Sequence, residues 1–381
     1  MKNFNFHTSW LEINEENLKH NINVFRNLIN QKTKLGVVLK SNAYGHGLFE
    51  VLACIHDLVD IIHVITPEDA LYIRNYELKN NLSPVRILVL GAINKEHLSV
   101  CIQNKIELVI YGNDWDEILS NHKSKKKVLA HIHLDTGLGR EGFSIDSKEL
   151  KALLKKHAAK IKLIGFMSHF ANTEDVTEQE YAKKQLANFR QYFKKNQLSV
   201  EKHFCASAAT LILNESHHDA VRIGIALYGM WPSKETKLSY SIISKNKIEL
   251  RPALEWKVKS QIVKDVNAGS YIGYGCTYKC ESKTKIAVFP VGYFDGFPRS
   301  LANKAYVLIN GQRCPLIGRV MMNHIVVDIT KIQRSNERVV ATMLGYDGAE
   351  EIKAENIAAW SDTINYEVTT RIGGHVPRII V

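Results

Sequence analysis

Through its first 240 residues the chain alternates short, largely β-branched apolar runs with longer stretches whose apolar residues recur at helical spacing. A continuous apolar run of about four to eight residues is typical of a buried strand, whereas the wider spacing favours an amphipathic helix. These runs predict eight strands, at residues 35–40, 61–66, 85–91, 106–112, 128–135, 161–169, 202–207 and 220–229.

Two of the intervening stretches carry clear helix signals. In the first, Asn14 is a suitable N-cap, two glutamates follow it, and an apolar face is formed by Leu18, Ile22, Phe25, Leu28 and Ile29. In the second, the apolar face contains Leu186, Phe189 and Phe193. Eight strands alternating with helices predict an α/β fold with a (β/α)₈ barrel, although a doubly wound sheet would give a similar pattern.

After about residue 240 the pattern changes to alternating segments interrupted by Gly and Pro, which is typical of antiparallel strands. The segments are 253–266, 285–299, 304–320, 324–330 and 338–348. We therefore predict a barrel domain over residues 10–237 and an antiparallel β domain over residues 238–381. Residues 1–9 are expected to pack with the second domain.

Composition excludes several classes of protein. The net charge is +11, but the basic runs at 123–127 and 154–162 contain no interleaved aromatic residues, which favours solvated faces over nucleic-acid binding. No apolar run approaches the ~20 residues of a membrane helix, and no secretory signal is visible, so a cytoplasmic location is expected. The six cysteines lack metal-ligand or disulfide spacing, so we predict neither a metal site nor disulfides.

Polar side chains stand at or near the carboxyl ends of the predicted strands, where a barrel places its active groups. They are Lys40, Arg140, His169, Ser207 and Arg222. A partly desolvated lysine beside other cations has a lowered pKa and can form an imine. Taken alone, Lys40 also fits a lysine at a strand end with its charge in solvent, and His169 fits a hydrogen-bonded structural histidine.

The segment around residue 224 adds a possible phosphate site. Backbone N–H groups of Gly224 and Ile225, with the Ser207 hydroxyl, could cradle a phosphate, as barrels often do near their seventh and eighth strands. A lysine, a phosphate site and polarising arginines together indicate pyridoxal phosphate. The glycines at 137–142 do not have dinucleotide-binding spacing.

Several motifs, in order along the chain, together resemble the alanine racemase family from Trp10 to Arg378. They are "VVLKSNAYGHG", "HLDTGLGREGF", "GFMSHFA", "SAAT", "VRIGIALYG", "IGYGCTY", "VGYFDGFPR", "IGRVMMN" and "INYEVTTRIGGHVPR". The resemblance implies an isomerase whose barrel binds pyridoxal phosphate through a lysine imine. It also implies a homodimer in which the β domain of a second subunit completes each site.

The resemblance assigns roles to individual residues. Lys40 would hold the cofactor and act as one acid/base, and Tyr274 of the partner subunit, oriented by His169, would be the second. Arg222 would face the pyridine nitrogen, and Arg140 the phenolic oxygen side. The phosphate would be bound by Tyr44, Ser207, Gly224, Ile225 and Tyr366.

The same resemblance implies which residues bind the substrate and which line its entry path. Arg140 and Met322 would contact the substrate carboxylate. The corridor through which substrate enters would be lined by Tyr293, Arg299, Arg319 and Glu174. The implied activity is interconversion of L- and D-alanine by two bases, supplying D-alanine for peptidoglycan.

Three positions depart from the alanine-specific pattern. Where the family often has a lysine that becomes carbamylated, this chain has His133, so the charge partner of Arg140 must come from elsewhere, such as a bound anion. The usual "NS" is Ala206-Ser207, and the usual "CMD" is Met321-Met322-Asn323. A broad-spectrum amino-acid racemase therefore stays open.

Two further classes of protein are alternatives. A non-catalytic pyridoxal-phosphate-binding barrel is disfavoured by Tyr274 and the full second domain. A decarboxylase would need an acidic residue where Arg222 stands. An arginine there would leave the pyridine nitrogen largely unprotonated and so limit side reactions.

Overall fold

The computed structural model describes residues 7–175, 179–244, 247–332 and 337–381. The chain packs as two compact units, each assembled from segments that are distant in sequence. The barrel unit comprises Leu18–Lys40 and Leu52–Arg251. The sheet unit comprises Met1–Asn17, Ser41–Val51 and Pro252–Val381. The predicted domain boundary near Lys237 stays a prediction.

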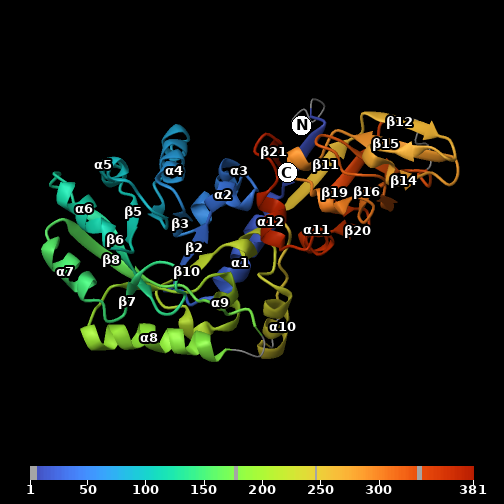
Figure 1. The fold of residues 1–381 in the computed structure, drawn as a ribbon. Helices are drawn as coiled ribbons and strands as arrows, with labels where there is room; N and C mark the ends of the chain where they lie inside the picture. Colours follow the sequence, from blue (N-terminus) through green and yellow to red (C-terminus); the bar gives the residue numbers. More distant parts are fainter. Residues whose placement is uncertain (1–6, 176–178, 245–246, 333–336) are drawn as a thin grey trace. The chain divides into compact units, whose positions relative to one another are not determined.

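In the described part of the barrel unit, eight parallel strands form a closed barrel, each hydrogen-bonded to the next (Figure 1). Pairing of β5 with β6 and of β10 with β2 completes the ring, which confirms the barrel over the doubly wound alternative. The strands are β2 (Lys34–Val38), β3 (Ile61–Val64), β4 (Arg86–Val89), β5 (Glu107–Ile110), β6 (Val128–Asp135), β8 (Ile161–Met167), β9 (Glu201–His203) and β10 (Ala220–Ile223).

Helices surround these strands, with α4 to α8 lying outside the barrel (Figure 1). The predicted cap is present, because Asn14 Oδ1 accepts a hydrogen bond from Asn17 N at 2.8 Å. The apolar side chains predicted for α8 are buried. The helices are α1 (Glu15–Leu28), α3 (Leu48–Ile55), α4 (Pro67–Lys79), α5 (Lys95–Gln103), α6 (Asp114–Asn121), α7 (Lys148–Lys156), α8 (Glu180–Asn196), α9 (Ser207–Ile212) and α10 (Lys234–Ile243).

The sheet unit is built on antiparallel strands, as predicted. Its largest sheet has the order β17-β16-β19-β11-β1-β21, and β20 pairs with β19. A second sheet is β12-β15-β18, and β13 pairs with β14. The strands are β1 (Ser9–Ile13), β11 (Leu254–Lys259), β12 (Ile262–Val266), β13 (Tyr271–Ile272), β14 (Tyr278–Lys279), β15 (Thr284–Phe289), β16 (Tyr306–Ile309), β17 (Gln312–Pro315), β18 (Ile325–Asp328), β19 (Val340–Asp347), β20 (Glu350–Ile352) and β21 (Arg378–Ile380).

Three features of the sheet unit were not predicted. The N-terminal strand β1 lies between β11 and β21, and its pairing with β21 is parallel. Helices α11 (Ala354–Ser361) and α12 (Asn365–Thr370) lie between β20 and β21 along the chain. Of the N-terminal residues expected to pack here, 1–6 lie outside the described residues, while the Thr8 carbonyl accepts a hydrogen bond from Lys259 N at 2.7 Å.

The barrel strands end earlier than predicted. Strand β2 ends at Val38, β8 at Met167 and β9 at His203. Lys40, His169 and Ser207 therefore stand in the segments after the strands and not on them. Single backbone hydrogen bonds continue past two of these ends, from Leu39 N to the His63 carbonyl at 2.8 Å and from Arg222 N to the Cys205 carbonyl at 2.9 Å, so the apolar run in the sequence is longer than the regular strand.

Candidate active site

Lys40 opens an unusual turn, α2 (Lys40–Tyr44). Its next four residues, Ser41 to Tyr44, all have φ between 51° and 55°. This left-handed conformation costs a residue with a side chain roughly 1–2 kcal/mol, so a run of four must be held by its surroundings. Asn42 helps to stabilise the turn, because its Oδ1 accepts a hydrogen bond from Leu48 N at 2.8 Å and its carbonyl accepts one from Gly47 N at 3.0 Å.

The half-buried amine of Lys40 is electrostatically prepared for nucleophilic chemistry. Burial lowers the pKa of Lys40, the positive charge of Arg140 lowers it further, and the negative charge of Glu141 opposes both. A lysine with a lowered pKa presents more neutral amine at physiological pH, which is the form that attacks a carbonyl.

Arg140 has its charge partner within the chain. Arg140 Nη2 donates to Glu141 Oε1 at 3.1 Å, and the same oxygen lies 3.8 Å from Nδ1 of His133. His133 is buried, and its Nδ1 has no hydrogen-bond partner among the residues that the structure describes. Burial, followed by the charges of Arg222 and Arg140, lowers the pKa of His133 to about 4, so this ring is neutral. The charge partner of Arg140, for which a bound anion was suggested, is the side chain of Glu141.

Removing the charge of Arg140 and removing the charge of Glu141 should shift the pH midpoint of the Lys40 reaction in opposite directions. Arg140→Gln removes the charge that lowers the pKa of Lys40, so its reaction midpoint should rise. Glu141→Gln removes the opposing charge, so the midpoint should fall. The measurement is acylation of Lys40 in the cofactor-free protein by acetic anhydride across the alkaline range, read by peptide mass spectrometry. The exposed Lys32 is the internal reference, and shifts in the same direction would contradict this account.

Arg222 is buried among neutral acceptors. Its Nη2 donates to the carbonyls of Ser168 at 2.7 Å and Phe204 at 3.0 Å, and to Nδ1 of His169 at 3.2 Å. Its Nη1 donates to Nδ1 of His203 at 2.9 Å. Burial lowers the pKa of Arg222 to about 10, which still leaves the guanidinium charged at neutral pH.

The contact with Arg222 assigns the tautomer of His169. Because a guanidinium only donates, Nδ1 of His169 must accept, and the ring proton is on Nε2. Burial, followed by the charge of Arg222, lowers the pKa of His169 to about 3, so the ring is neutral. His169 therefore offers one N–H donor at Nε2.

The predicted phosphate-binding residues fall into two groups. In the barrel unit, Ser207 Oγ accepts from the backbone N–H of Gly224 at 2.9 Å, and Ile225 follows in the next short helix. In the sheet unit, the rings of Tyr44 and Tyr366 are 6.2 Å apart between centroids. Burial raises the pKa of Tyr44 to about 12, so this hydroxyl remains a hydrogen-bond donor.

A cavity of about 420 Å³ in the sheet unit gathers most of the remaining predicted residues. The predicted residues that line it are Tyr274, Tyr293, Arg299, Arg319 and Met322. Tyr274 is 73% exposed. Gly275 beside it has φ +74°, and a Cβ there would lie 3.0 Å from the Arg319 guanidinium carbon. The predicted corridor residue Glu174 belongs instead to the barrel unit, where burial raises its pKa and a hydrogen bond with Ser233 opposes that rise.

Sequence reasoning missed the residues that support Arg140 and Arg222. These are Glu141, His203 and, behind His203, His131. The available signal was the alternation in "HIHLD", which places His131 and His133 on the same face of β6. His131 and His203 also lie near Glu201, but Arg86 and Lys34 donate to that carboxylate, and their charges oppose a cation there. We assign no metal to this group.

The fold and these residues define a class of protein: a (β/α)₈ barrel with a half-buried lysine after its first strand, joined to an antiparallel sheet unit. Residues 13–232 match the family model "Alanine racemase, N-terminal domain", and residues 253–380 match "Alanine racemase, C-terminal domain". The chain belongs to the alanine racemase family.

Similar proteins cover almost the whole chain. Alanine racemase from Leptospira interrogans is 37% identical over 385 residues, covering 98% of this chain and 96% of that protein. The crystal structure of alanine racemase from Bacillus anthracis with bound L-Ala-P has a TM-score of 0.88 and 31% identity, covering 99% of this chain and 95% of that chain. The structure from Bartonella henselae with covalently bound pyridoxal phosphate has a TM-score of 0.81 and 26% identity, covering 98% and 100%. In the described residues, no helix is long and apolar enough to cross a membrane.

Proposed function

We propose that the protein interconverts L- and D-alanine with pyridoxal phosphate, using Lys40 and Tyr274 of the partner subunit as the two bases. The observation that carries the proposal is the half-buried Lys40, whose pKa is lowered by burial and by Arg140, in a barrel that also buries Arg222 among neutral acceptors. Family membership over both domains supports the reaction class.

The residues of this chain fit the cofactor. Lys40 offers an amine with a lowered pKa for an imine, and Arg222 offers a donor to a neutral ring nitrogen. The Ser207 hydroxyl and the Gly224 N–H form a compact donor set suited to phosphate. Tyr44, Ile225 and Tyr366 would complete that set, and Arg140 would face the phenolic oxygen. When bound, pyridoxal phosphate supplies an electron sink that acidifies the Cα–H bond of an amino acid.

Racemisation then requires a proton acceptor on each face of one carbon. Lys40 Nζ takes or returns the proton on one face, and the phenolic oxygen of Tyr274 of the partner subunit does so on the other. Because His169 carries its proton on Nε2, it can donate to that phenolic oxygen and orient it. The 73% exposure of Tyr274 in a single chain suits a residue donated to a second subunit.

Arg222 limits the reaction to racemisation. A guanidinium does not give up its proton at neutral pH, so a ring nitrogen held by Arg222 would stay unprotonated and the cofactor would supply a weaker electron sink. A weak sink disfavours transamination and decarboxylation. Arg140 and Met322 would hold the substrate carboxylate, and the corridor residues would control access. Peptidoglycan supply and the cytoplasmic location stay predictions.

The proposed substrate is tested by racemisation rates of the purified protein with pyridoxal phosphate. Chiral chromatography would follow L-alanine, L-serine, L-lysine and L-arginine. We expect kcat/KM for alanine to exceed the others by at least about 10-fold, since a pocket discriminates by about 1–3 kcal/mol per added group. Faster turnover of lysine or arginine would favour a broad-spectrum racemase, which the changes at His133 and Asn323 keep as the second candidate. Cofactor binding without any turnover would favour a non-catalytic binding protein.

A further inference from the structure

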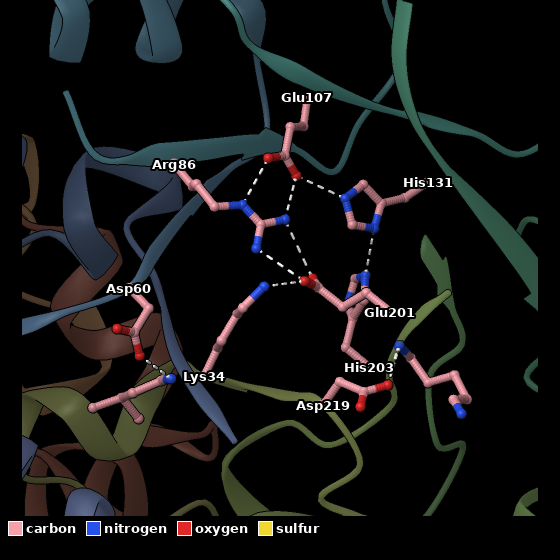
Figure 2. A network of polar contacts seen from close by, with 10 residues as sticks. Lys34, Asp60, Arg86, Glu107, His131, Glu201, His203 and Asp219 are labelled. Carbon is pink, nitrogen blue, oxygen red and sulfur yellow. Dashed lines mark hydrogen bonds and ion pairs between the residues drawn. The ribbon is translucent and has the colours of Figure 1, made fainter. Parts of the chain in front are cut away.

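A buried chain of hydrogen bonds runs from Arg222 to a carboxylate at the opposite end of the barrel strands. Arg222 Nη1 donates to His203 Nδ1 at 2.9 Å, and His203 Nε2 lies 2.9 Å from His131 Nδ1. His131 Nε2 lies 2.7 Å from Glu107 Oε2 (Figure 2). All four side chains are buried, and all belong to the barrel unit. The proposed reaction uses only Arg222 of these four.

The two ends of this chain of hydrogen bonds determine which ring nitrogens of the two histidines carry a proton. Arg222 can only donate, so Nδ1 of His203 accepts and its proton is on Nε2. That proton is donated to His131 Nδ1, so the proton of His131 is on Nε2 and is donated to Glu107. A charged His131 would place two donors against each other, so both rings are neutral.

Glu107 is anchored as an anion at the other end. Burial raises its pKa, but hydrogen bonds from His131 and Arg86 outweigh burial and lower the pKa of Glu107 to about 2. Arg86 binds it through Nε at 2.7 Å and Nη2 at 2.8 Å, and also donates to Glu201 at 2.9 Å. Arg86, Glu107 and Glu201 are the first residues of β4, β5 and β9, respectively.

Strand β8, which lies between β6 and β9, leaves room for this chain of hydrogen bonds. Gly165 on β8 pairs with His131 on one side and Glu201 on the other. A Cβ at Gly165 would lie 2.9 Å from Nδ1 of His131, the atom that accepts from His203. A side chain at Gly165 would therefore displace the imidazole at the middle of the chain.

We infer that Glu107 is a positioning residue for Arg222, acting through the neutral imidazoles of His131 and His203; the inference rests on the proposed function of Arg222 at the cofactor ring. Hydrogen bonds aligned in one direction polarise one another, so the carboxylate strengthens the bond that His203 accepts. The guanidinium is thereby held in one orientation as a charged donor. Arg86 and Glu201 have no link of their own to Arg222 in this chain of contacts.

The first test needs no cofactor and no substitution. Nitrogen-15 NMR of the cofactor-free protein, with imidazole rings labelled, should show His131 and His203 as neutral rings protonated at Nε2. A proton on Nδ1 of either ring would overturn the inference whatever the activity of the protein.

The second test compares two matched variants. Glu107→Gln and Glu201→Gln each remove one carboxylate charge from Arg86 and from the neighbourhood of the two imidazoles, but only Glu107 accepts a hydrogen bond from one of these rings. In Glu107→Gln we expect the ring signals of His131 and His203 to move and kcat for alanine to fall about 10-fold with KM nearly unchanged, by analogy with lost outer-shell partners at metal sites. Glu201→Gln, which removes no hydrogen bond from either ring, should change the ring signals less than Glu107→Gln and should keep the wild-type kcat.

The outcomes separate this inference from the proposed function. If the wild-type protein does not racemise alanine but the ring signals respond more to Glu107→Gln than to Glu201→Gln, the proposed function fails and the hydrogen-bond chain stands. If the wild-type protein racemises alanine and the two variants have the same ring signals and kcat, Glu107 has only a structural role and the inference is wrong.

Discussion

Lys40→Ala should abolish both racemisation and the covalent link to pyridoxal phosphate. Removing a nucleophile that also acts as an acid/base should lower kcat by about 10⁴-fold or more. The loss reflects the particular position of Lys40, where burial and Arg140 lower its pKa and increase the fraction of neutral amine. A lysine elsewhere on the surface would be mostly protonated at neutral pH.

Borohydride reduction followed by peptide mass spectrometry measures this directly. In the wild-type protein the reduced cofactor should be attached to the peptide that contains Lys40, and in Lys40→Ala no such adduct should form. Lys32→Ala, at an exposed lysine eight positions earlier, is the matched control and should keep the adduct and the activity. A Lys40→Ala protein that keeps the same reducible adduct would show that the cofactor lysine has been misassigned.

Tyr274→Phe should separate cofactor binding from turnover. Loss of one acid/base should lower kcat by about 10²–10⁴-fold in both directions of the reaction, while the borohydride adduct at Lys40 persists. The hydroxyl is at an exposed position, so the free energy of unfolding should change by less than about 0.5 kcal/mol. The measurements are kcat for L- and D-alanine and chemical denaturation.

Tyr271→Phe is the control for this substitution. Tyr271 is 56% exposed and lies on β13, three residues before Tyr274, so it tests a lost phenol in the same hairpin region. Its turnover should match the wild-type protein. If Tyr274→Phe also turned over at the wild-type rate, the second base would have to be another group.

The barrel could be predicted from sequence because each strand is an apolar run with a length set by the barrel wall. The eight runs correspond to the eight strands found in the described residues. Most of their ends could not be predicted, because apolar residues such as Leu39 and Phe204 continue beyond the last residue of the regular strand and remain buried. The left-handed turn from Ser41 to Tyr44 contradicts the local preference of all four residues, so only its surroundings can specify it.

The hydrogen bonds behind Arg222 depend on which strands pair and in which register. Local sequence patterns do not predict that pairing. His203 meets Arg222 because β9 pairs with β10, and His131 meets His203 across β8. The parallel pairing of β1 with β21 likewise joins residues near the two ends of the sequence. Motif resemblance named Arg222, but only the three-dimensional arrangement identifies Glu107 behind it.

The most direct test of the central claim is a mixed dimer of two inactive variants. One chain carries Lys40→Ala, the other carries Tyr274→Phe, and different affinity tags isolate dimers that contain one copy of each. If each site combines Lys40 of one subunit with Tyr274 of the partner subunit, one site in the mixed dimer carries both substitutions and the other carries neither. We therefore predict about half of the wild-type activity per dimer from two inactive parents. A mixed dimer as inactive as its parents would contradict the shared two-base site.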